Sequence, residues 1–468
     1  FPLSQSLLSD DDLQCSSLGN SRTSWGAESW DVCLQSEQRW PFTLGQYLWT
    51  GWDYIGEPTP YHTRSSYFGT IDTAGFPKDA WLDPKTHPMV HLFPYWDFNE
   101  GQLIDLCACT NAHSVELFVN GESLGRKVLD SAKGRTASWQ AAYHPGSVKV
   151  VAYDENGKVV ATDEQDSFDD SAMVCLQADR KTISGDGREL AFITITTRDK
   201  NGNPVRNAND CVTVRVNGAG VLVGLDNGDS ADPDEYQTDS RRLFSGMLLA
   251  VVAGNGRTGT ITVDVTAPGL RPAVLTLNAA PFEGPVRRRL PPLTFGGSTQ
   301  EIPVRKLALT AERTALDKEH PVTHITAARR PAAATFTDIE WQLTDDKGVP
   351  AVNAAMQPDG DVLTVTALGD GTLRVRALVR NGHDAPQLIS QLELSISGVG
   401  QLHKNPYEFI SASRFDASFG DIGNGNERGV STSRTGRSWV LFDDIDFGPD
   451  GADTVELPIF ALDGEPTT

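Results

Sequence analysis

The stretch ELAFITITTRDKNGNPV, residues 189–205, alternates apolar and polar side chains and then ends in a turn. Such alternation places the apolar side chains on one face of a β-strand. The Asn-Gly pair that follows is a turn signal, because both residues tolerate a left-handed backbone. The stretch therefore predicts a half-buried strand followed by a tight turn.

The same pattern recurs along most of the chain. HSVELFVNGESLGRK (113–127) predicts a β-hairpin that turns at Asn120-Gly121. SVKVVAYDENGKVVATD (147–163) predicts a second hairpin around Asn156-Gly157. Strands and turns at this spacing are typical of tandem immunoglobulin-like β-sandwiches of about 80–110 residues each.

Length and composition agree with several sandwich domains. The chain has 468 residues, enough for three to five domains of roughly 100–150 residues. Hydrophobic residues make up 39%, so cores can form, and 43 Gly with 27 Pro indicate many turns. We therefore predict a mainly β fold.

The first residues read differently from the rest. AESWDVCLQSEQRW (27–40) suits an amphipathic helix, and GQYLWTGW (45–52) reads as a buried strand. A helix followed by a buried strand is typical of an α/β domain, and one of each cannot form a domain. This part is therefore predicted to be the end of a larger α/β domain.

These patterns divide the chain into six predicted regions. They are an α/β remnant (1–86), a β-sandwich (87–167), an immunoglobulin-like domain (168–282), a Pro/Gly/Arg-rich linker (283–300), a second immunoglobulin-like domain (301–400) and a partial β-sandwich (404–468).

Charge and apolar runs exclude some partners. The net charge of −22 argues against nucleic acid and anionic membranes. The longest apolar run, MLLAVVAG (247–254), is too short to span a bilayer. Six cysteines are too few for a disulfide scaffold. We expect no nucleic-acid partner and no membrane insertion, and the compartment, cytoplasmic or secreted, stays open.

Acidic clusters are the candidate metal sites. GLDNGDSADPDE (224–235) could offer carboxylates to calcium, but it lacks the EF-hand spacing and closing Glu. A solvated acidic loop is the preferred interpretation, and DDIDFGPDGAD (443–453) is interpreted in the same way. The sequence therefore predicts neither a metal site nor a cofactor.

GQYLWTGWDYIGEPTP (45–60) is the candidate binding stretch. Its Trp49, Trp52, Asp53 and Glu57 supply aromatic faces and carboxylates, the side chains that stack on sugar rings and accept hydrogen bonds from hydroxyls. A core strand with a polar turn is the alternative from composition alone.

The stretch from Gly45 to Asp79 resembles the last barrel strand and following loop of glycoside hydrolase family 2 β-galactosidases of the long, multidomain type. Residues 89–127 resemble the sandwich after the barrel, and 195–229 resemble the next immunoglobulin-like domain. The final block resembles the first half of a family-6-type carbohydrate-binding module. The resemblance implies the last strand and loop of a (β/α)8 barrel before the sandwiches.

The resemblance also implies roles for individual residues. Trp49 would line the galactosyl subsite, and Glu57 would accept hydrogen bonds from sugar hydroxyls. Asp53 would do the same or brace the loop, and bracing is preferred, while Trp52 is expected in the core. Both catalytic glutamates of the family precede this motif. We therefore expect no catalytic residue in the chain, which would act with a missing N-terminal portion.

One comparison within the family narrows the expected substrate, and one departure from the family concerns the barrel. Family 2 glucuronidases carry Asn-x-Lys before the following Gly, whereas Ser66-Tyr67-Phe68 precedes Gly69 here. A buried sugar carboxylate without a cation is unfavourable, so a neutral galactoside is the expected substrate. In addition, LDPKTHPMV (82–90) arrives earlier than in the family, which indicates that the last barrel helix is shortened or missing.

The complete protein is thus expected to be a retaining β-galactosidase, and this chain alone is expected to be inactive. The alternative is a non-catalytic carbohydrate-binding or adhesin-like array, because tandem immunoglobulin-like modules serve many functions. The stretch at 45–60 favours the enzyme, since an array has no use for a barrel strand.

Overall fold

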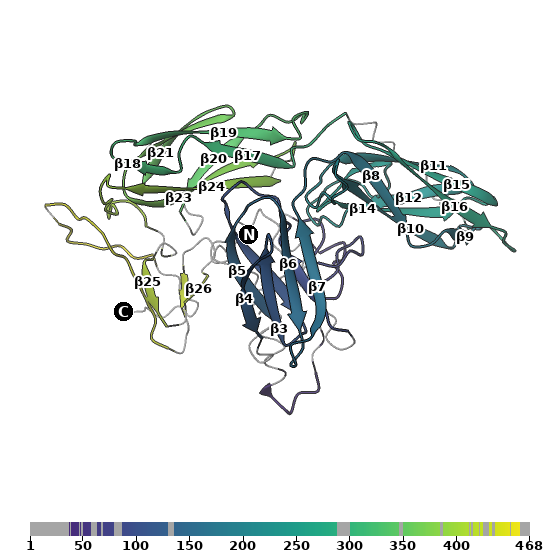
Figure 1. Ribbon diagram of the computed structural model, residues 1–468, viewed down its shortest axis with the longest axis horizontal. Helices are drawn as coiled ribbons and strands as arrows, with labels where there is room; N and C mark the ends of the chain where they lie inside the picture. The colour runs from purple at the N-terminus through teal and green to yellow at the C-terminus, as the bar shows by residue number, and fades with distance from the viewer. Residues whose placement is uncertain are drawn as a thin grey trace.

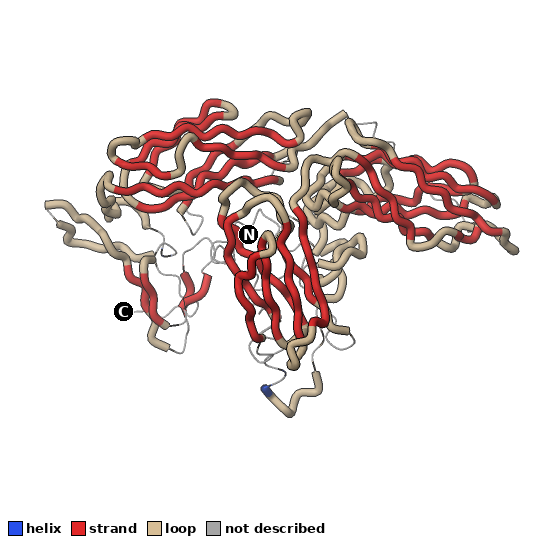
Figure 2. Tube along the Cα trace, viewed as in Figure 1, coloured by secondary structure: helices blue, strands red, loops and turns tan. Residues whose placement is uncertain are grey.

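The computed structural model is built mainly from β-strands (Figure 2). It describes residues 37, 39–45, 47, 50–57, 63–66, 69–78, 87–129, 135–287, 300–345, 350–383, 387–410, 412, 415–420, 422–424, 430–432, 436–449 and 451–458. Within these ranges, no helix is long and apolar enough to cross a membrane.

The first sandwich packs a three-stranded sheet against a four-stranded one, around a core that contains Trp96, Leu106 and Leu117. The strand order of the three-stranded sheet is β1 (Val90–Phe93), β2 (Leu103–Thr110), β5 (Thr136–Ala142). The strand order of the four-stranded sheet is β4 (Glu122–Val128), β3 (Ser114–Val119), β6 (Ser147–Tyr153), β7 (Val159–Asp166). The hairpin predicted at 113–127 is confirmed as β3–β4. Its Asn120 and Gly121 have φ of 50° and 85°, as a two-residue hairpin turn requires.

The second sandwich contains residues 189–205. Its β10 alternates buried Ala191, Ile193 and Ile195 with less buried neighbours, as predicted. The strand order of the four-stranded sheet is β12 (Gly220–Asp226), β14 (Met247–Gly254), β10 (Leu190–Arg198), β8 (Met173–Ala178). The strand order of the five-stranded sheet is β13 (Ser240–Arg242), β11 (Cys211–Gly218), β15 (Gly259–Thr266), β16 (Ala273–Ala280), β9 (Thr182–Ser184). All pairings are antiparallel except β16 with β9.

The third sandwich pairs two four-stranded sheets around Trp341, whose indole N–H donates to the carbonyl of Gly360 at 3.1 Å. The strand order of one sheet is β17 (Lys306–Ala311), β19 (Val322–Arg330), β22 (Val362–Ala367), β21 (Ala354–Asp359). The strand order of the other is β18 (Ala315–Asp317), β24 (Leu388–Ser397), β23 (Gly371–Val379), β20 (Glu340–Thr344).

The C-terminal block is a smaller assembly of short strands (Figure 1). Its two-stranded sheets join β25 (Ala417–Phe419) to β28 (Trp439–Leu441), and β26 (Ile422–Asn424) to β27 (Val430–Thr432). The acidic stretch near Asp443 is exposed, as predicted.

The N-terminal part departs from the prediction of a buried strand. Tyr47 is fully exposed and the exposed fraction of Trp52 is 59%, so placing Trp52 in the core is wrong. A single parallel bridge to Ile71 pairs the backbone of Trp52 and leaves its indole uncovered. The expected barrel strand is not shown in the described ranges, and of the helix expected at 27–40 only residues 37, 39 and 40 are described, the first two of them helical.

The three large sandwiches meet at Arg305, which precedes β17. Its guanidinium lies 2.7 Å from Asp97 of the first sandwich and 2.7 Å from Asp170, at the start of the second. Lys306 adds a second cation to Asp97 at 2.5 Å. Figure 1 shows the first sandwich below the place where the other two approach each other. Arg305 thus joins three domains.

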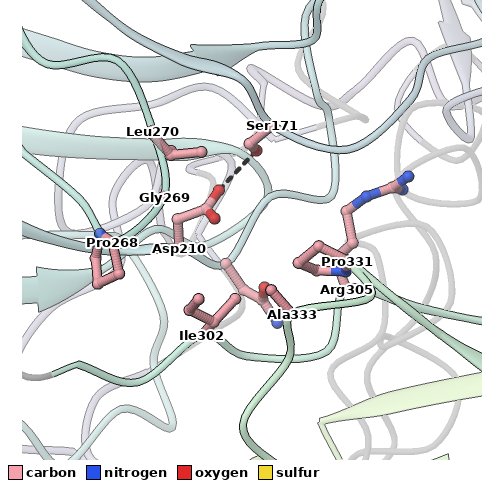
Figure 3. A pocket seen from close by; sticks show the side chains of 10 residues that line it. Ser171, Asp210, Pro268, Gly269, Leu270, Ile302, Arg305, Pro331 and Ala333 are labelled. Carbon is pink, nitrogen blue, oxygen red and sulfur yellow. Dashed lines mark hydrogen bonds between the residues drawn. The ribbon is translucent and has the colours of Figure 1, made fainter.

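A small cavity of about 90 Å³ lies beside this junction (Figure 3). Arg305 lines it together with Asp210, whose carboxylate accepts a hydrogen bond from the Ser171 hydroxyl at 2.7 Å. Burial raises the pKa of Asp210 above its ordinary value. The cavity is lined mainly by apolar groups and lies between the second and third sandwiches, where the Asn209 amide also donates to the carbonyl of Val304 at 2.9 Å.

Replacing Arg305 with Ala should destabilise the chain strongly. Arg305 and Asp97 have side chains only 5% and 6% exposed, and loss of one partner of a buried pair costs about 3–5 kcal/mol. The control is Arg380→Ala, because the Arg380–Glu340 pair is 38% and 43% exposed and contributes about 1 kcal/mol or less. Urea denaturation followed by tryptophan fluorescence measures both, and equal losses would contradict this role of Arg305.

Candidate functional site

Of the predicted binding residues, Asp53 and Glu57 lie in the segment 50–78, of which residues 50–57, 63–66 and 69–78 are described, whereas Trp49 lies outside the described residues. The segment folds back on itself through isolated bridges, Trp52 with Ile71 and Ile55 with Ser65. Backbone hydrogen bonds from Asp53 N to Ile71 O and from Ser66 N to Tyr54 O hold these strands together. Asp53 and Glu57 are therefore carried on one braced turn.

Asp53 is buried and points into the segment. Its Oδ2 pairs with Lys78 Nζ at 2.5 Å, and its Oδ1 accepts from Gly69 N at 2.7 Å. Burial raises the pKa of Asp53, and Lys78 and the Gly69 amide partly offset this effect. A Cβ on Gly69 would lie 2.3 Å from Asp53 N, so only glycine allows this approach. The contacts are those of a bracing carboxylate, and Lys78 was not singled out in the sequence.

Glu57 is exposed on the other side of the turn. Its Oε2 accepts a hydrogen bond from the Tyr54 hydroxyl at 2.5 Å. Successive side chains of an extended chain alternate sides, so Trp52 and Tyr54 face away from buried Asp53. The turn thus carries the exposed side chains of Trp52 and Glu57, together with the half-buried Tyr54 that donates to Glu57. Tyr54 carries no specific signal in the sequence beyond its aromatic type.

A loop of the second sandwich holds this segment in place. The backbone N–H groups of Arg64 and Ser65 both donate to Ser230 O, at 2.7 and 3.3 Å. The Arg64 guanidinium donates to Asp234 O at 2.5 Å and lies 5.1 Å from the centre of the Tyr236 ring. The loop that was predicted to be solvated therefore makes a contact surface.

That loop is built by its own acidic and amide side chains, which corrects the prediction of a solvated loop. Each of four Asp or Asn side chains accepts from the backbone N–H two residues on: Asp226, Asn227, Asp229 and Asp232. Asp232 also pairs with Arg241 at 2.9 Å, with side chains 5% and 1% exposed. The Asp-rich composition of residues 226–232 thus satisfies part-buried backbone amides, whereas Asp234 and Glu235 are exposed as predicted.

Two carboxylates meet across the contact. Gly228 lies against Asp72, because a Cβ on this glycine would be 2.1 Å from Asp72 Oδ2. Asp226 Oδ1 accepts hydrogen bonds from Gly228 N at 2.9 Å and from the Thr73 hydroxyl at 3.2 Å. Burial, with the nearby charge of Asp226, raises the pKa of Asp72 to about 6. Burial also raises the pKa of Asp226.

The raised pKa of Asp72 makes this contact weaken as pH rises. The folded state holds the proton more tightly than the unfolded state, so stability falls from about pH 4 to about pH 6 and stays low above it. Asp72→Asn should remove this loss, about 3 kcal/mol at neutral pH, while its amide oxygen still accepts from Phe76 N.

Differential scanning calorimetry from pH 4 to pH 8 measures the effect of Asp72→Asn. The unfolding temperature of the variant should exceed that of the parent at pH 8 and converge with it at pH 4. Asp166→Asn, at an exposed position, is the control. A parent and variant that keep a constant difference across this range would contradict the assignment.

Within the described ranges, no group of three or more His, Cys, Asp or Glu side chains is arranged to hold a metal ion. The glycines of GAGVLVG (218–224), which could suggest a phosphate cradle, belong to the β11–β12 turn and to a bulge after Leu222. The site therefore offers aromatic rings, hydroxyls and carboxylates.

Comparison with known proteins relates two of these sandwiches to known domains. Residues 174–276 match glycoside hydrolase family 2 C-terminal domain 5, and residues 101–161 match a domain of unknown function, DUF4982. The β-galactosidase BoGH2A of Bacteroides ovatus is 40% identical over 282 residues, which cover 58% of this chain and 32% of that protein. A β-glucuronidase of Formosa agariphila is 23% identical over 227 residues, 47% of this chain and 23% of that protein.

A solved structure agrees with these matches. A β-glycosidase from Bacteroides vulgatus superposes with a TM-score of 0.50 at 32% identity, over 54% of this chain and 33% of that chain. The chain spans about a quarter to a third of the length of the β-galactosidase and the β-glucuronidase. The sandwich at 174–276 is a C-terminal domain of the kind found in family 2 glycoside hydrolases, and the chain is similar over 58% of its length to a β-galactosidase.

Proposed function

We propose that this chain supplies one wall of the galactosyl-binding subsite of a family 2 β-galactosidase. The observation that carries the proposal is the turn that Asp53 braces, which carries the exposed side chains of Trp52 and Glu57 and the half-buried Tyr54 that donates to Glu57. The 40% identity with a β-galactosidase supports the choice of reaction.

The chemistry of this turn suits a neutral sugar. The C–H face of a pyranose stacks on aromatic rings, and its hydroxyls donate to carboxylates. Glu57 is held by Tyr54 but keeps an exposed carboxylate, so it can accept from a sugar hydroxyl. Trp49 is proposed as the stacking platform from the sequence resemblance, and the exposed Trp52 joins it as a candidate.

The reaction assigned to the complete enzyme is hydrolysis with retention. One carboxylate attacks the anomeric carbon to form a galactosyl–enzyme ester, and a carboxylic acid protonates the departing oxygen. The same acid, now a base, activates the water that hydrolyses the ester. We assign neither role to this chain: Asp53 is engaged by Lys78, and Glu57 is proposed as a hydroxyl acceptor. The 468-residue chain should therefore not hydrolyse galactosides alone.

A β-glucuronidase is the second candidate, because a β-glucuronidase of Formosa agariphila is also related in sequence. A glucuronide brings a carboxylate that needs a cation in a desolvated site. Phe68 stands where family 2 glucuronidases carry the cation, and Lys78 is already paired with Asp53. These residues favour the galactoside.

Glu57→Gln in the complete enzyme should weaken galactoside binding. A hydrogen bond to a charged acceptor contributes about 1.5–3 kcal/mol, which corresponds to a rise in KM of roughly 10- to 100-fold. Steady-state hydrolysis of p-nitrophenyl β-D-galactoside measures KM, and calorimetry checks that the unfolding temperature is unchanged. The matched control is Glu155→Gln, at an exposed turn of the first sandwich.

An unchanged KM in Glu57→Gln would remove Glu57 from the sugar subsite. The same assay with p-nitrophenyl β-D-glucuronide decides the substrate. We expect kcat/KM to favour the galactoside, and a preference for the glucuronide would replace the first candidate with the second. Galactoside hydrolysis by residues 1–468 alone would contradict the placement of both catalysts outside the chain.

A further inference from the structure

The sugar-facing turn is connected to the second sandwich by an unbroken series of contacts. Ser230 O accepts from Arg64 N and Ser65 N, and Ser65 forms a bridge with Ile55. Ser66 donates its N–H to Tyr54 O and accepts from Tyr54 N through its hydroxyl, both at 3.0 Å. Tyr54 in turn donates to Glu57.

The loop at the other end of this series is held by contacts within its own domain. Arg241 is 1% exposed, pairs with Asp232 and donates to the carbonyls of Leu225 and Glu235, each at 3.3 Å. The ring of Tyr236 lies 4.9 Å from the Arg241 guanidinium and 5.1 Å from that of Arg64. A loop fixed from inside its own domain can hold the segment that rests on it.

We propose that the loop 226–236 of the second sandwich is a positioning element of the sugar-binding wall. It fixes Arg64 and Ser65, which set the position of Tyr54 and Glu57. This inference rests on the proposed function, because it assigns the sugar to Glu57. The second sandwich is thereby a working part of the subsite, and residues far from any sugar control its affinity.

Two variants undock the segment from opposite sides of the contact. Gly228→Ala places a Cβ 2.1 Å from Asp72 Oδ2, whereas Gly202→Ala, its control, has a similar positive φ and nothing within 4 Å of the added atom. Arg64→Ala removes the guanidinium that reaches Asp234 O, and Arg180→Ala, at an exposed ion pair, is its control.

Hydrogen exchange measures the docking of the segment on the loop 226–236 without any sugar. The amides to follow are those of Arg64 and Ser65, which donate to Ser230 O. We expect Gly228→Ala and Arg64→Ala to accelerate this exchange at least about tenfold, as loss of their acceptor requires. Neither control should change it. Unaltered exchange in both variants would overturn the docking contact.

Steady-state kinetics of the complete enzyme measure positioning, through the change in KM compared with the change in kcat. We expect both undocked variants to raise the KM for p-nitrophenyl β-D-galactoside about tenfold with kcat changed less than about twofold, because the wall binds substrate and transition state alike. The double variant should be no worse than the singles, since undocking occurs once. Additive effects in the double variant would count against a shared undocking step.

The outcomes separate this inference from the proposed function. Accelerated exchange with an unchanged KM would overturn positioning, and the Glu57→Gln result would still stand by itself. If Gly228→Ala lowers the unfolding temperature of the whole chain, Arg64→Ala decides, because it introduces no steric overlap. An enzyme without galactoside activity would refute the proposed function, and the exchange measurement would still report on docking.

Discussion

The arrangement of the chain depends on buried arginines that reach from one domain to the carboxylates of another. Arg305 binds Asp97 and Asp170, and so fixes the third sandwich to the first and second. Of two neighbouring arginines in β13, one acts within the second sandwich and the other reaches the third. Arg241 holds the loop 226–236, whereas Arg242 pairs with Glu301 and contacts His383 of the third sandwich. Buried ion pairs are directional, so they fix orientation where a sliding apolar contact would not.

In the proposal, this constraint gives the second sandwich a role in the candidate site. The loop 226–236 is held by the second sandwich, and the segment 50–78 rests on that loop through Arg64 and Ser65. Asp72 and Asp226 lie where the two parts meet, with raised pKa values. A sugar-binding wall that depends on a neighbouring domain would respond to changes made well away from the sugar.

The sandwiches could be predicted from the sequence, whereas the site could be predicted only in part. Alternation in 113–127 and 189–205 is local, so it marks strands and turns directly. The partners of Asp53 and Arg64 lie far along the chain, and no local pattern announces Lys78 or Ser230. The prediction of a solvated acidic loop failed for a related reason. The Asp side chains of this loop accept from their own backbone, and the burial of Asp232 depends on Arg241, a contact that forms only in the folded domain.

The turn that carries Glu57 is proposed to touch the sugar, and a crystal structure of the complete enzyme with bound galactose tests this directly. We predict the Glu57 carboxylate within hydrogen-bond distance of a galactose hydroxyl and the Arg64 amide still on Ser230 O, at about 3 Å in both cases. Galactose bound with Glu57 pointing to solvent, or with segment 50–78 away from the loop 226–236, would contradict the proposal.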